Sequence, residues 1–211
     1  MRPHHSTTDG AVRSAAVNGA AHAPVVRDAL RSRTGTGPAS AESRYACRQP
    51  DKNDGAAIWE LVRKSGALDL NSAYSYLMMS EYFAETSRVA YRGRRLAGFV
   101  AGFTPPRKPD TLFVWQIGID PREQGRGLGK HLLRNLLATP PCGHLRHLEA
   151  TVTPSNRASA RLFRGIAAHF NVPCRIEPVF AEHDFPGEGH EAERRFRIGP
   201  IPTVGRAGAR A

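Results

Sequence analysis

Seven consecutive residues have the composition of an anion-binding turn, and they lie between an apolar run and an amphipathic stretch. They are Gln124, Gly125, Arg126, Gly127, Leu128, Gly129 and Lys130. Glycine permits positive φ angles and carries no Cβ, so the backbone can approach a phosphate closely. The helix expected from about Gly127 adds unpaired N–H groups and the positive end of its dipole at the same point. This composition predicts the binding of a phosphate chain.

The spacing of the glycines excludes two common phosphate loops. No glycine stands at the required distance before a Lys-Ser or Lys-Thr pair, and Gly125, Gly127 and Gly129 do not fit G-x-G-x-x-G. The segment from Gln124 to Gly129 fits Q/R-x-x-G-x-G/A instead, and it resembles the coenzyme A loop of the GNAT acyltransferase family. The resemblance implies an α/β fold with a mixed, twisted sheet that helices flank on both faces, and acetyl-coenzyme A as the co-substrate.

The apolar run LFVWQIGI, residues 112–119, is the strand that this resemblance places beside the thioester. In the family, an amine attacks acetyl-coenzyme A directly, without an acyl-enzyme. A bulge near Ile117 to Ile119 is expected to splay the strand from its neighbour and to leave a backbone N–H for the thioester oxygen, and Gly118 permits such a bulge. Ile117 and Ile119 therefore belong to the expected cofactor set. No Cys stands in this strand, so covalent catalysis has no support.

A second match to the family lies in TPSNRASARLF, residues 153–163. Asn156 begins the helix where the family usually has an Asn near the pantetheine, and Ser159 follows on the same helix. Many family members carry a Tyr that protonates the departing thiolate at the position of Phe163. Phe163 has no proton to give, so the thiolate's proton comes from water, from the substrate or from another side chain.

Three further blocks lie outside the cofactor motif: ALDLNSAYSYLMMSEYF, DTLFVWQIGID and GHEAERRF. Together they resemble the diaminobutyrate acetyltransferases of ectoine biosynthesis, and the resemblance covers about residues 45 to 198. It implies acetylation of the 4-amino group of L-2,4-diaminobutyrate, which gives N4-acetyl-L-2,4-diaminobutyrate for a compatible solute made under osmotic stress. It also implies a homodimer.

This substrate carries a carboxylate and two amines, so its site needs acidic anchors, a carboxylate clamp and an apolar wall. Asp69 and Glu193 are the candidates for the α-ammonium, and Trp115 for the wall. His190 or water held by Glu193 is the candidate base, because the reacting amine must lose a proton before it attacks. The predicted catalytic set is His190, Glu193 and Tyr74. The predicted carboxylate donors are Tyr74, Asn71 and Ser72.

Structural roles compete with several of these assignments. Tyr74 shares a helical face with apolar residues and is about as well explained as a core aromatic with a wet hydroxyl. Trp115 in a buried strand is more often a core residue than a ligand wall. Asp69 has an alternative role as the cap of the following helix. These alternatives stay open at the level of sequence.

The elements that must position these residues follow from hydrophobic periodicity and from turn signals. A short edge strand is expected at residues 45–48, then a helix whose N-cap lies within Asp51 to Asp54 and which stops at Gly66, and a second helix from Ser72 to about Glu85. A β-hairpin follows around Gly93, then the central strand, a helix from about 127 to 137 and a strand at HLEATV. The last elements are a helix from Asn156 to about His169 and strands at 174–179 and 193–198.

Composition sets the limits of the folded domain, which is expected over residues 45–198. Residues 1–44 are poor in large apolar side chains and are expected to be a disordered tail, with a flexible tail at 199–211. The net charge of +11 includes both tails, and residues 51–198 carry 21 basic and 16 acidic side chains. Three separated cysteines indicate a reducing compartment, so a cytoplasmic protein is expected.

Other classes of function are less well supported. No run is long enough for a membrane span, and no basic run alternates with aromatics as in a nucleic-acid reader. The histidines lack partners at metal-ligand spacing, so no metal site is predicted. Two alternatives remain: acetylation of another small amine or a protein N-terminus, and a non-catalytic basic module that binds nucleic acid. The intact glycine turn favours an enzyme, because a protein without a phosphate ligand gains nothing from it.

Overall fold

A mixed sheet of seven strands forms the centre of the computed structural model, which describes residues 44–66, 68–187 and 189–202. The strands lie in the order β1-β2-β3-β4-β5-β7-β6. Their bounds are β1 (Ala46–Arg48), β2 (Arg88–Arg92), β3 (Arg95–Phe103), β4 (Thr111–Ile119), β5 (His147–Val152), β6 (Cys174–Phe180) and β7 (Glu193–Ile198). The expected tails at 1–43 and 203–211 lie outside the described residues.

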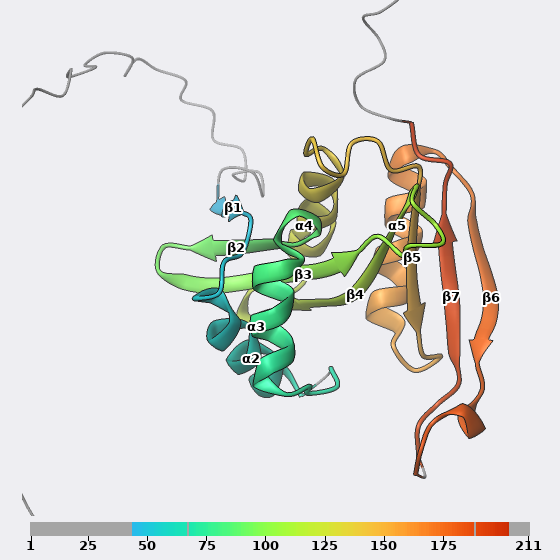
Figure 1. Ribbon diagram of the computed structural model, residues 1–211, viewed down its shortest axis with the longest axis horizontal. Coiled ribbons are helices and arrows are strands. Elements are labelled where there is room, and N and C mark those ends of the chain that lie inside the picture. Colours follow the sequence, from blue (N-terminus) through green and yellow to red (C-terminus); the bar gives the residue numbers. More distant parts are fainter. Residues whose placement is uncertain (1–43, 67, 188, 203–211) are drawn as a thin grey trace, which may run out of the picture. The chain divides into compact units, whose positions relative to one another are not determined.

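The sheet consists of two antiparallel groups joined by one parallel pair. Strands β1 to β4 pair antiparallel, as do β5, β7 and β6, while β4 and β5 run parallel. Figure 1 shows the two groups running in markedly different directions: β2 to β4 lie roughly horizontally in the view, and β5, β7 and β6 roughly vertically. The expected edge strand, hairpin and central strand are all present, with β4 in the middle of the sheet.

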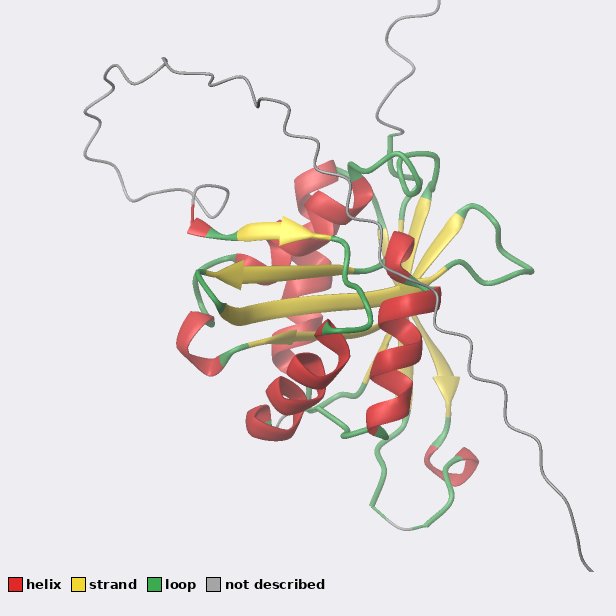
Figure 2. Ribbon diagram, turned by 60° about the vertical axis from the view of Figure 1, so that its left-hand side comes forward, coloured by secondary structure: helices red, strands yellow, loops and turns green. Residues whose placement is uncertain are grey.

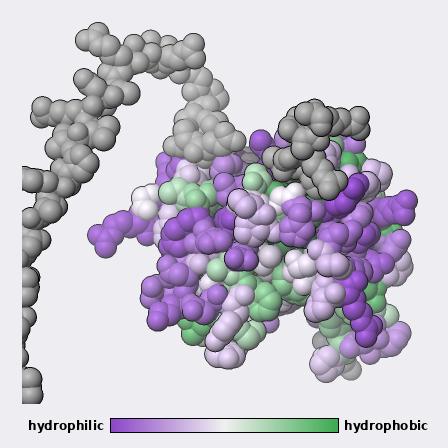
Figure 3. Space-filling model, turned by 45° about the horizontal axis from the view of Figure 1, so that its top comes forward, coloured by the Kyte–Doolittle hydropathy of each residue, from purple (hydrophilic) through white to green (hydrophobic). Residues whose placement is uncertain are grey.

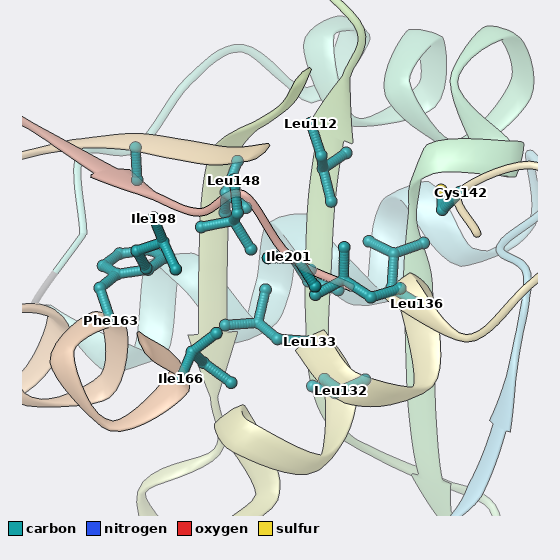
Figure 4. Close-up of a cluster of buried hydrophobic side chains, with 14 of the residues drawn as sticks. Leu112, Leu132, Leu133, Leu136, Cys142, Leu148, Phe163, Ile166, Ile198 and Ile201 are labelled. Carbon is teal, nitrogen blue, oxygen red and sulfur yellow. The ribbon is translucent and has the colours of Figure 1, made fainter. Parts of the chain in front are cut away.

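Helices cover both faces of the sheet, as Figures 1 and 2 show. Two of them, α2 (Asp54–Ser65) and α3 (Ala73–Tyr82), pack on one face, and α4 (Leu128–Leu137) and α5 (Arg157–Phe170) pack on the other. Each pair encloses its own apolar cluster, and Figure 4 shows the larger one, where Leu132, Leu133 and Ile166 meet the sheet. The expected α/β architecture with helices on both faces is confirmed.

The helix ends follow the turn chemistry of the sequence. Helix α2 ends at Gly66, whose φ of 60° lies in the left-handed region. Ser72 caps α3 through its side chain, which accepts a hydrogen bond from the Ser75 N–H. Asn156 caps α5 in the same way, with 3.0 Å between its Oδ1 and the Ser159 nitrogen. The side-chain caps therefore fix where α3 and α5 begin.

Buried carboxylates tie the elements together through ion pairs. Asp54 at the start of α2 accepts two hydrogen bonds from Arg48, at 2.7 and 2.8 Å, and one from the Tyr91 hydroxyl at 2.7 Å. Glu149 on β5 pairs with Arg197, its cross-strand neighbour on β7, and with Lys108 at 2.9 Å.

Figure 3 shows a surface where hydrophilic residues surround small hydrophobic patches.

The packed domain continues beyond the boundary expected at residue 198. Ile201 is 4% exposed and belongs to the larger apolar cluster, where Figure 4 places it beside Leu136. Its backbone N–H donates to the Arg146 carbonyl oxygen at 2.6 Å. The expectation of a flexible tail from residue 199 therefore needs correction, because the residues up to Pro202 are part of the described fold.

Candidate active site

The site is built on the place where β4 and β5 separate. The two strands pair at Thr111, Leu112 and Phe113, and the pairing ends there. Beyond Phe113 the strands diverge and leave a cleft of about 590 Å³, which Val114 to Ile117 line on one side and Ala150 to Val152 on the other. We call this cavity the strand cleft. The backbone of β4 faces it along an edge without a neighbouring strand, which is where a ligand can use free backbone donors.

A bulge in β4 decides which side chains enter the strand cleft. Against β3, Ala101 pairs with Gln116 and Gly102 pairs with Val114, so one extra residue, Trp115, stands in β4. Val114 and Ile117 both pack on the α4 side of the sheet. The alternation of the strand therefore reverses at the bulge, and the consecutive residues Trp115 and Gln116 both face the α2–α3 side.

The predicted position of the bulge, near Ile117 to Ile119, was wrong. Those residues pair regularly with β3, and the irregularity lies earlier, at Trp115. Gly118 has a packing role instead, because a Cβ there would come within 2.5 Å of the Phe99 ring and 3.2 Å of a Leu61 methyl group. A side chain at this position would force the Phe99 ring to move.

The glycine turn has the backbone conformation that its composition predicts. Gly125 and Gly127 have φ angles of 72° and 79°, and Gly127 is the N-cap of α4. A second cleft of about 590 Å³ lies against this turn and against α5, and we call it the turn cleft. Because the first turn of α4 has no intrahelical acceptors for its N–H groups, these donors and the helix dipole are available to an anion in this cleft.

A buried carboxylate holds the turn in place from below. Glu123 is 1% exposed and accepts hydrogen bonds from the Tyr45 hydroxyl at 2.9 Å, from Arg95 at 2.6 Å and from Arg92 at 3.1 Å. Burial alone would raise the pKa of the Glu123 carboxyl, but these hydrogen bonds lower it to about 2. Arg95 also bonds Asp120 at 2.5 Å, so both residues that flank the short turn before the glycines are fixed to the β2–β3 hairpin.

The two clefts meet at the start of α5. Ile117, Asn156 and Ser159 line both of them, together with Leu68 and Ala158. An extended molecule whose phosphates lie at the glycine turn can therefore pass Asn156 and reach the diverging strands. Phe163 lines the strand cleft from α5 and is 2% exposed, with its ring 6.2 Å from that of Phe196. Phe163 therefore places an apolar ring, which has no hydroxyl, against this cleft.

His190 enters the strand cleft from the loop before β7. Its ring stacks on Phe185, with 3.6 Å between ring centroids and 13° between planes. Its Nδ1 lies 2.7 Å from the Glu191 carbonyl oxygen. A carbonyl oxygen only accepts, so Nδ1 carries a hydrogen and Nε2 keeps its lone pair in the neutral ring. This arrangement suits His190 to accept a proton at Nε2.

Sequence comparison supplies the observation that decides the family. A sequence model described as "Acetyltransferase (GNAT) family" matches residues 56–166, which contain β4, the glycine turn and the first ten of the fourteen residues of α5. The chain belongs to the GNAT acetyltransferase family. The fold expected from the glycine turn is thereby confirmed.

Curated relatives narrow the comparison. The chain is 49% identical over 164 residues to an L-2,4-diaminobutyric acid acetyltransferase from Halalkalibacterium halodurans, which covers 78% of this chain and 86% of the relative. It is 37% identical over 157 residues to the protein of the same name from Halomonas elongata, with 74% and 81% covered. The resemblance to this group of GNAT enzymes is therefore confirmed over most of the chain.

Solved structures agree with this assignment. Diaminobutyrate acetyltransferase EctA from Paenibacillus lautus, solved with L-2,4-diaminobutyric acid and coenzyme A, matches with a TM-score of 0.73 and 39% identity, covering 76% of this chain and 98% of that one. The ribosomal-protein-S18-alanine N-acetyltransferase from Escherichia coli matches with a TM-score of 0.55 at 17% identity, covering 77% and 97%. The second likeness shows the fold alone.

Most of the predicted site residues of this GNAT domain come together in the two clefts. Those in the strand cleft are Asp69, Trp115, Ile117, Asn156, Ser159, Phe163, His190 and Glu193. Those in the turn cleft are Ile117, Ile119, Gln124, Gly125, Gly127, Leu128, Gly129, Lys130, Asn156 and Ser159. The structure therefore gathers residues from five separate segments, and their roles toward ligands stay predictions.

Four predicted residues do not line either cleft. Tyr74 is 69% exposed on α3, and Ser72 caps that helix. Asn71 bonds within its own segment, where its side-chain Nδ2 donates to the Asp69 carbonyl oxygen at 3.3 Å. Arg126 points back to Glu123, at 3.8 Å. For Asn71 and Ser72 these contacts explain the residue types without a ligand.

Two residues of the strand cleft were missed in the sequence. Gln116 lines the cleft from β4, and its Nε2 donates to the Asp69 carbonyl oxygen at 2.9 Å. Glu191 lines it from the loop before β7, and its Oε2 accepts from the Ser155 N–H at 3.1 Å. The signal for Gln116 was available, because it is the polar residue inside an otherwise apolar strand. Glu191 stands in the quoted block GHEAERRF between His190 and Glu193, but only those two neighbours were assigned roles from it.

Two kinds of site are absent from the part of the chain that the structure describes. No group of three or more His, Cys, Asp or Glu side chains in it could hold a metal ion. No helix among the same residues has the length and apolar character to cross a membrane.

Proposed function

We propose that this protein transfers the acetyl group of acetyl-coenzyme A to the 4-amino group of L-2,4-diaminobutyrate. The product is N4-acetyl-L-2,4-diaminobutyrate, an intermediate of ectoine biosynthesis. The observation that carries the proposal is the junction of the two clefts at Asn156, which joins a phosphate-binding turn to a cavity with Asp69, His190 and Glu193. The names and the extent of the curated relatives support the choice of substrate.

In the proposed mechanism, the glycine turn holds the pyrophosphate of the co-substrate and α5 guides its pantetheine arm into the strand cleft. Asp69 and Glu193 hold the α-ammonium, so the 4-amino group is the one that meets the thioester. The 4-ammonium group first gives a proton to His190 Nε2, directly or through water; the neutral nitrogen then attacks the thioester carbon, and the C–S bond breaks. Backbone N–H groups of β4 beyond Phe113 face the cleft and support the charge that develops on the carbonyl oxygen.

The leaving thiolate needs a proton from a source other than residue 163 of α5. Phe163 carries no ionisable group, and it fills the place where a tyrosine would stand. Two protons leave the nitrogen in all: the first passes to His190 and on to solvent before the attack, and the second, released after the attack, reaches the sulfur directly or through water. The reaction therefore releases one proton overall, and the protein supplies a base for the amine but no acid for the thiolate.

The test is the release of free thiol from acetyl-coenzyme A by the purified protein. We expect release with L-2,4-diaminobutyrate, and we expect mass and NMR spectra of the product to place the acetyl group on N4. Ornithine, 1,3-diaminopropane and a peptide with a free N-terminus serve as competing substrates. A faster reaction with one of these, or acetylation at N2, would reject the proposed substrate. Absence of thiol release with every amine would reject the reaction itself.

We also propose that the protein is a homodimer. Five large apolar side chains are exposed along α3 and the loop before it: Leu70, Tyr74, Leu77, Met78 and Tyr82. Soluble monomers rarely leave contiguous apolar surface in water, so this face supports contact with a second copy. Light scattering should give twice the chain mass, and Tyr82→Glu should halve it. Phe180→Glu, at an exposed aromatic on β6, is the control that should stay dimeric.

Two coarser expectations remain proposals. We infer a cytoplasmic protein, because Cys47, Cys142 and Cys174 are all free thiols, and thiols persist in a reducing compartment. We also infer that residues 1–43 and 203–211 are not needed for catalysis, because the cleft residues named above all lie between Leu68 and Glu193.

A further inference from the structure

Gln116 is a buried polar side chain whose hydrogen bonding the proposed mechanism does not use. It lies on β4 directly after the bulge at Trp115 and is 9% exposed. Its neighbours in the strand, from Leu112 to Ile119, are otherwise apolar or glycine. A polar amide in this position is costly to bury unless both of its ends have partners.

One end of the amide has a partner, and that partner fixes the orientation of the group. The Gln116 nitrogen Nε2 lies 2.9 Å from the backbone carbonyl oxygen of Asp69. A carbonyl oxygen accepts but cannot donate, so the nitrogen and not the oxygen of the amide must face it. The bond also holds the loop between α2 and α3, and with it the residue that we assign to the α-ammonium.

The other end of the amide has no partner among the described residues. Oε1 of Gln116 is buried, and no donor of residues 44–66, 68–187 or 189–202 lies within hydrogen-bond distance. Gln116 nevertheless lines the strand cleft, beside Trp115 and Asp69. An acceptor in this setting, with its donor end already engaged, is satisfied by a water molecule or, when the site is occupied, by a ligand that brings an N–H or O–H group.

We propose that Gln116 Oε1 accepts a hydrogen bond from an amino group of the bound diamine, so that Gln116 is a substrate-binding residue of this enzyme. The proposal rests on the proposed function and deepens it. The substrate's carboxylate cannot serve, because it only accepts. In this proposal, Oε1 of Gln116 accepts a hydrogen bond from the amine of the substrate. Its Nε2 donates to the backbone carbonyl oxygen of Asp69, which is the acidic residue assigned to the α-ammonium.

The test compares two substitutions that separate the ends of the amide. Gln116→Met keeps the volume and removes both donor and acceptor, and we expect the KM for diaminobutyrate to rise about 10- to 100-fold with the KM for acetyl-coenzyme A within about twofold. Gln116→Glu keeps the acceptor and removes the donor, so its KM for diaminobutyrate should stay within about fivefold of wild type. Gln49→Met, at an exposed glutamine outside both clefts, is the matched control and should change neither value.

Several outcomes would overturn the inference. If Gln116→Met leaves the KM for diaminobutyrate unchanged, Oε1 does not contact the substrate. If both Gln116 variants raise this KM equally, the side chain acts only by holding the loop. Gln116→Asn, which withdraws the amide by one methylene, replaces Gln116→Met if that variant does not fold. If wild type and Gln49→Met both fail to acetylate diaminobutyrate, the proposed function fails and the inference fails with it.

Discussion

Replacement of Gly127 by alanine separates the fold of the glycine turn from its ligand binding. Gly127 has φ 79° and ψ 6°, and a Cβ built there has no heavy atom within 4 Å. The folded protein thus has room for the methyl group, and the space that the group would enter borders the turn cleft. We expect Gly127→Ala to fold and to lose affinity for coenzyme A.

The cost to the fold comes from the left-handed conformation. A residue with a Cβ pays roughly 1–2 kcal/mol there, and glycine does not. For a protein of this length, 1 kcal/mol corresponds to a Tm change of about 2–4 °C, so Gly127→Ala should lower Tm by about 2–8 °C. Gly93→Ala is the matched control, because Gly93 has φ 60° in the β2–β3 turn and its Cβ is equally unobstructed. It should lose a similar amount of stability.

The cost to binding falls on Gly127→Ala alone. A Cβ in the path of the pyrophosphate breaks at least one charge-assisted hydrogen bond from the first turn of α4, worth about 1.5–3 kcal/mol. This energy corresponds to a rise in the Kd of coenzyme A of about 10- to 150-fold. Titration calorimetry with coenzyme A, alongside thermal unfolding of both variants and wild type, measures the two costs separately.

The comparison with Gly93→Ala also defines failure. If the two variants bind coenzyme A with the same Kd, the phosphate chain does not lie against Gly127 and the turn cleft is not its site. If Gly127→Ala keeps the wild-type Tm while Gly93→Ala does not, the positive φ at Gly127 is not required. Either result would refute the reasoning that connects the glycine turn to the co-substrate.

Three further predictions concern the carboxylates and the histidine of the site. The folded-state pKa of Glu123, about 2, lies below its ordinary value of 4.5, so the stability it contributes is present above that value and is lost as the pH falls toward 2. Unfolding free energies of wild type and Glu123→Gln should therefore converge as the pH drops through this window, and a constant difference would contradict the role. Asp69→Asn should raise the KM for diaminobutyrate far more than that for acetyl-coenzyme A; equal effects would remove Asp69 from the α-ammonium site. His190→Ala should shift the acidic limb of the pH–rate profile, and if His190→Ala and Glu193→Ala both keep the wild-type profile, neither takes part in removing the amine proton.

Local sequence was sufficient for the elements because their determinants lie within a few residues. A near-continuous run of apolar β-formers indicates β4, and Ser72 and Asn156 mark the starts of their helices through side-chain caps. The bounds predicted for β7 match those of the structure. The glycine turn is equally local, since its function depends on φ angles and on a helix N-terminus that follows directly in the chain.

The position of the bulge could not be predicted from β4 alone. A bulge is a relation between two strands, and it is set by how Ala101 and Gly102 pair with Val114 and Gln116. Its consequence, that Trp115 and Gln116 face the same side, contradicts simple alternation. This explains why Trp115 was expected at the site from the family resemblance while Gln116 was missed, although the two residues line the same cleft.

The amino-acid sequence by itself determined the glycine turn, the order of the elements and the family, because each depends on spacing along the chain. Only the tertiary structure decided which side chains share a cavity. Asp69, Trp115 and His190 come from segments far apart in the sequence, and they meet because β4 and β5 separate after Phe113. Where two strands part depends on the helices packed on both faces of the sheet, and no local pattern records that balance.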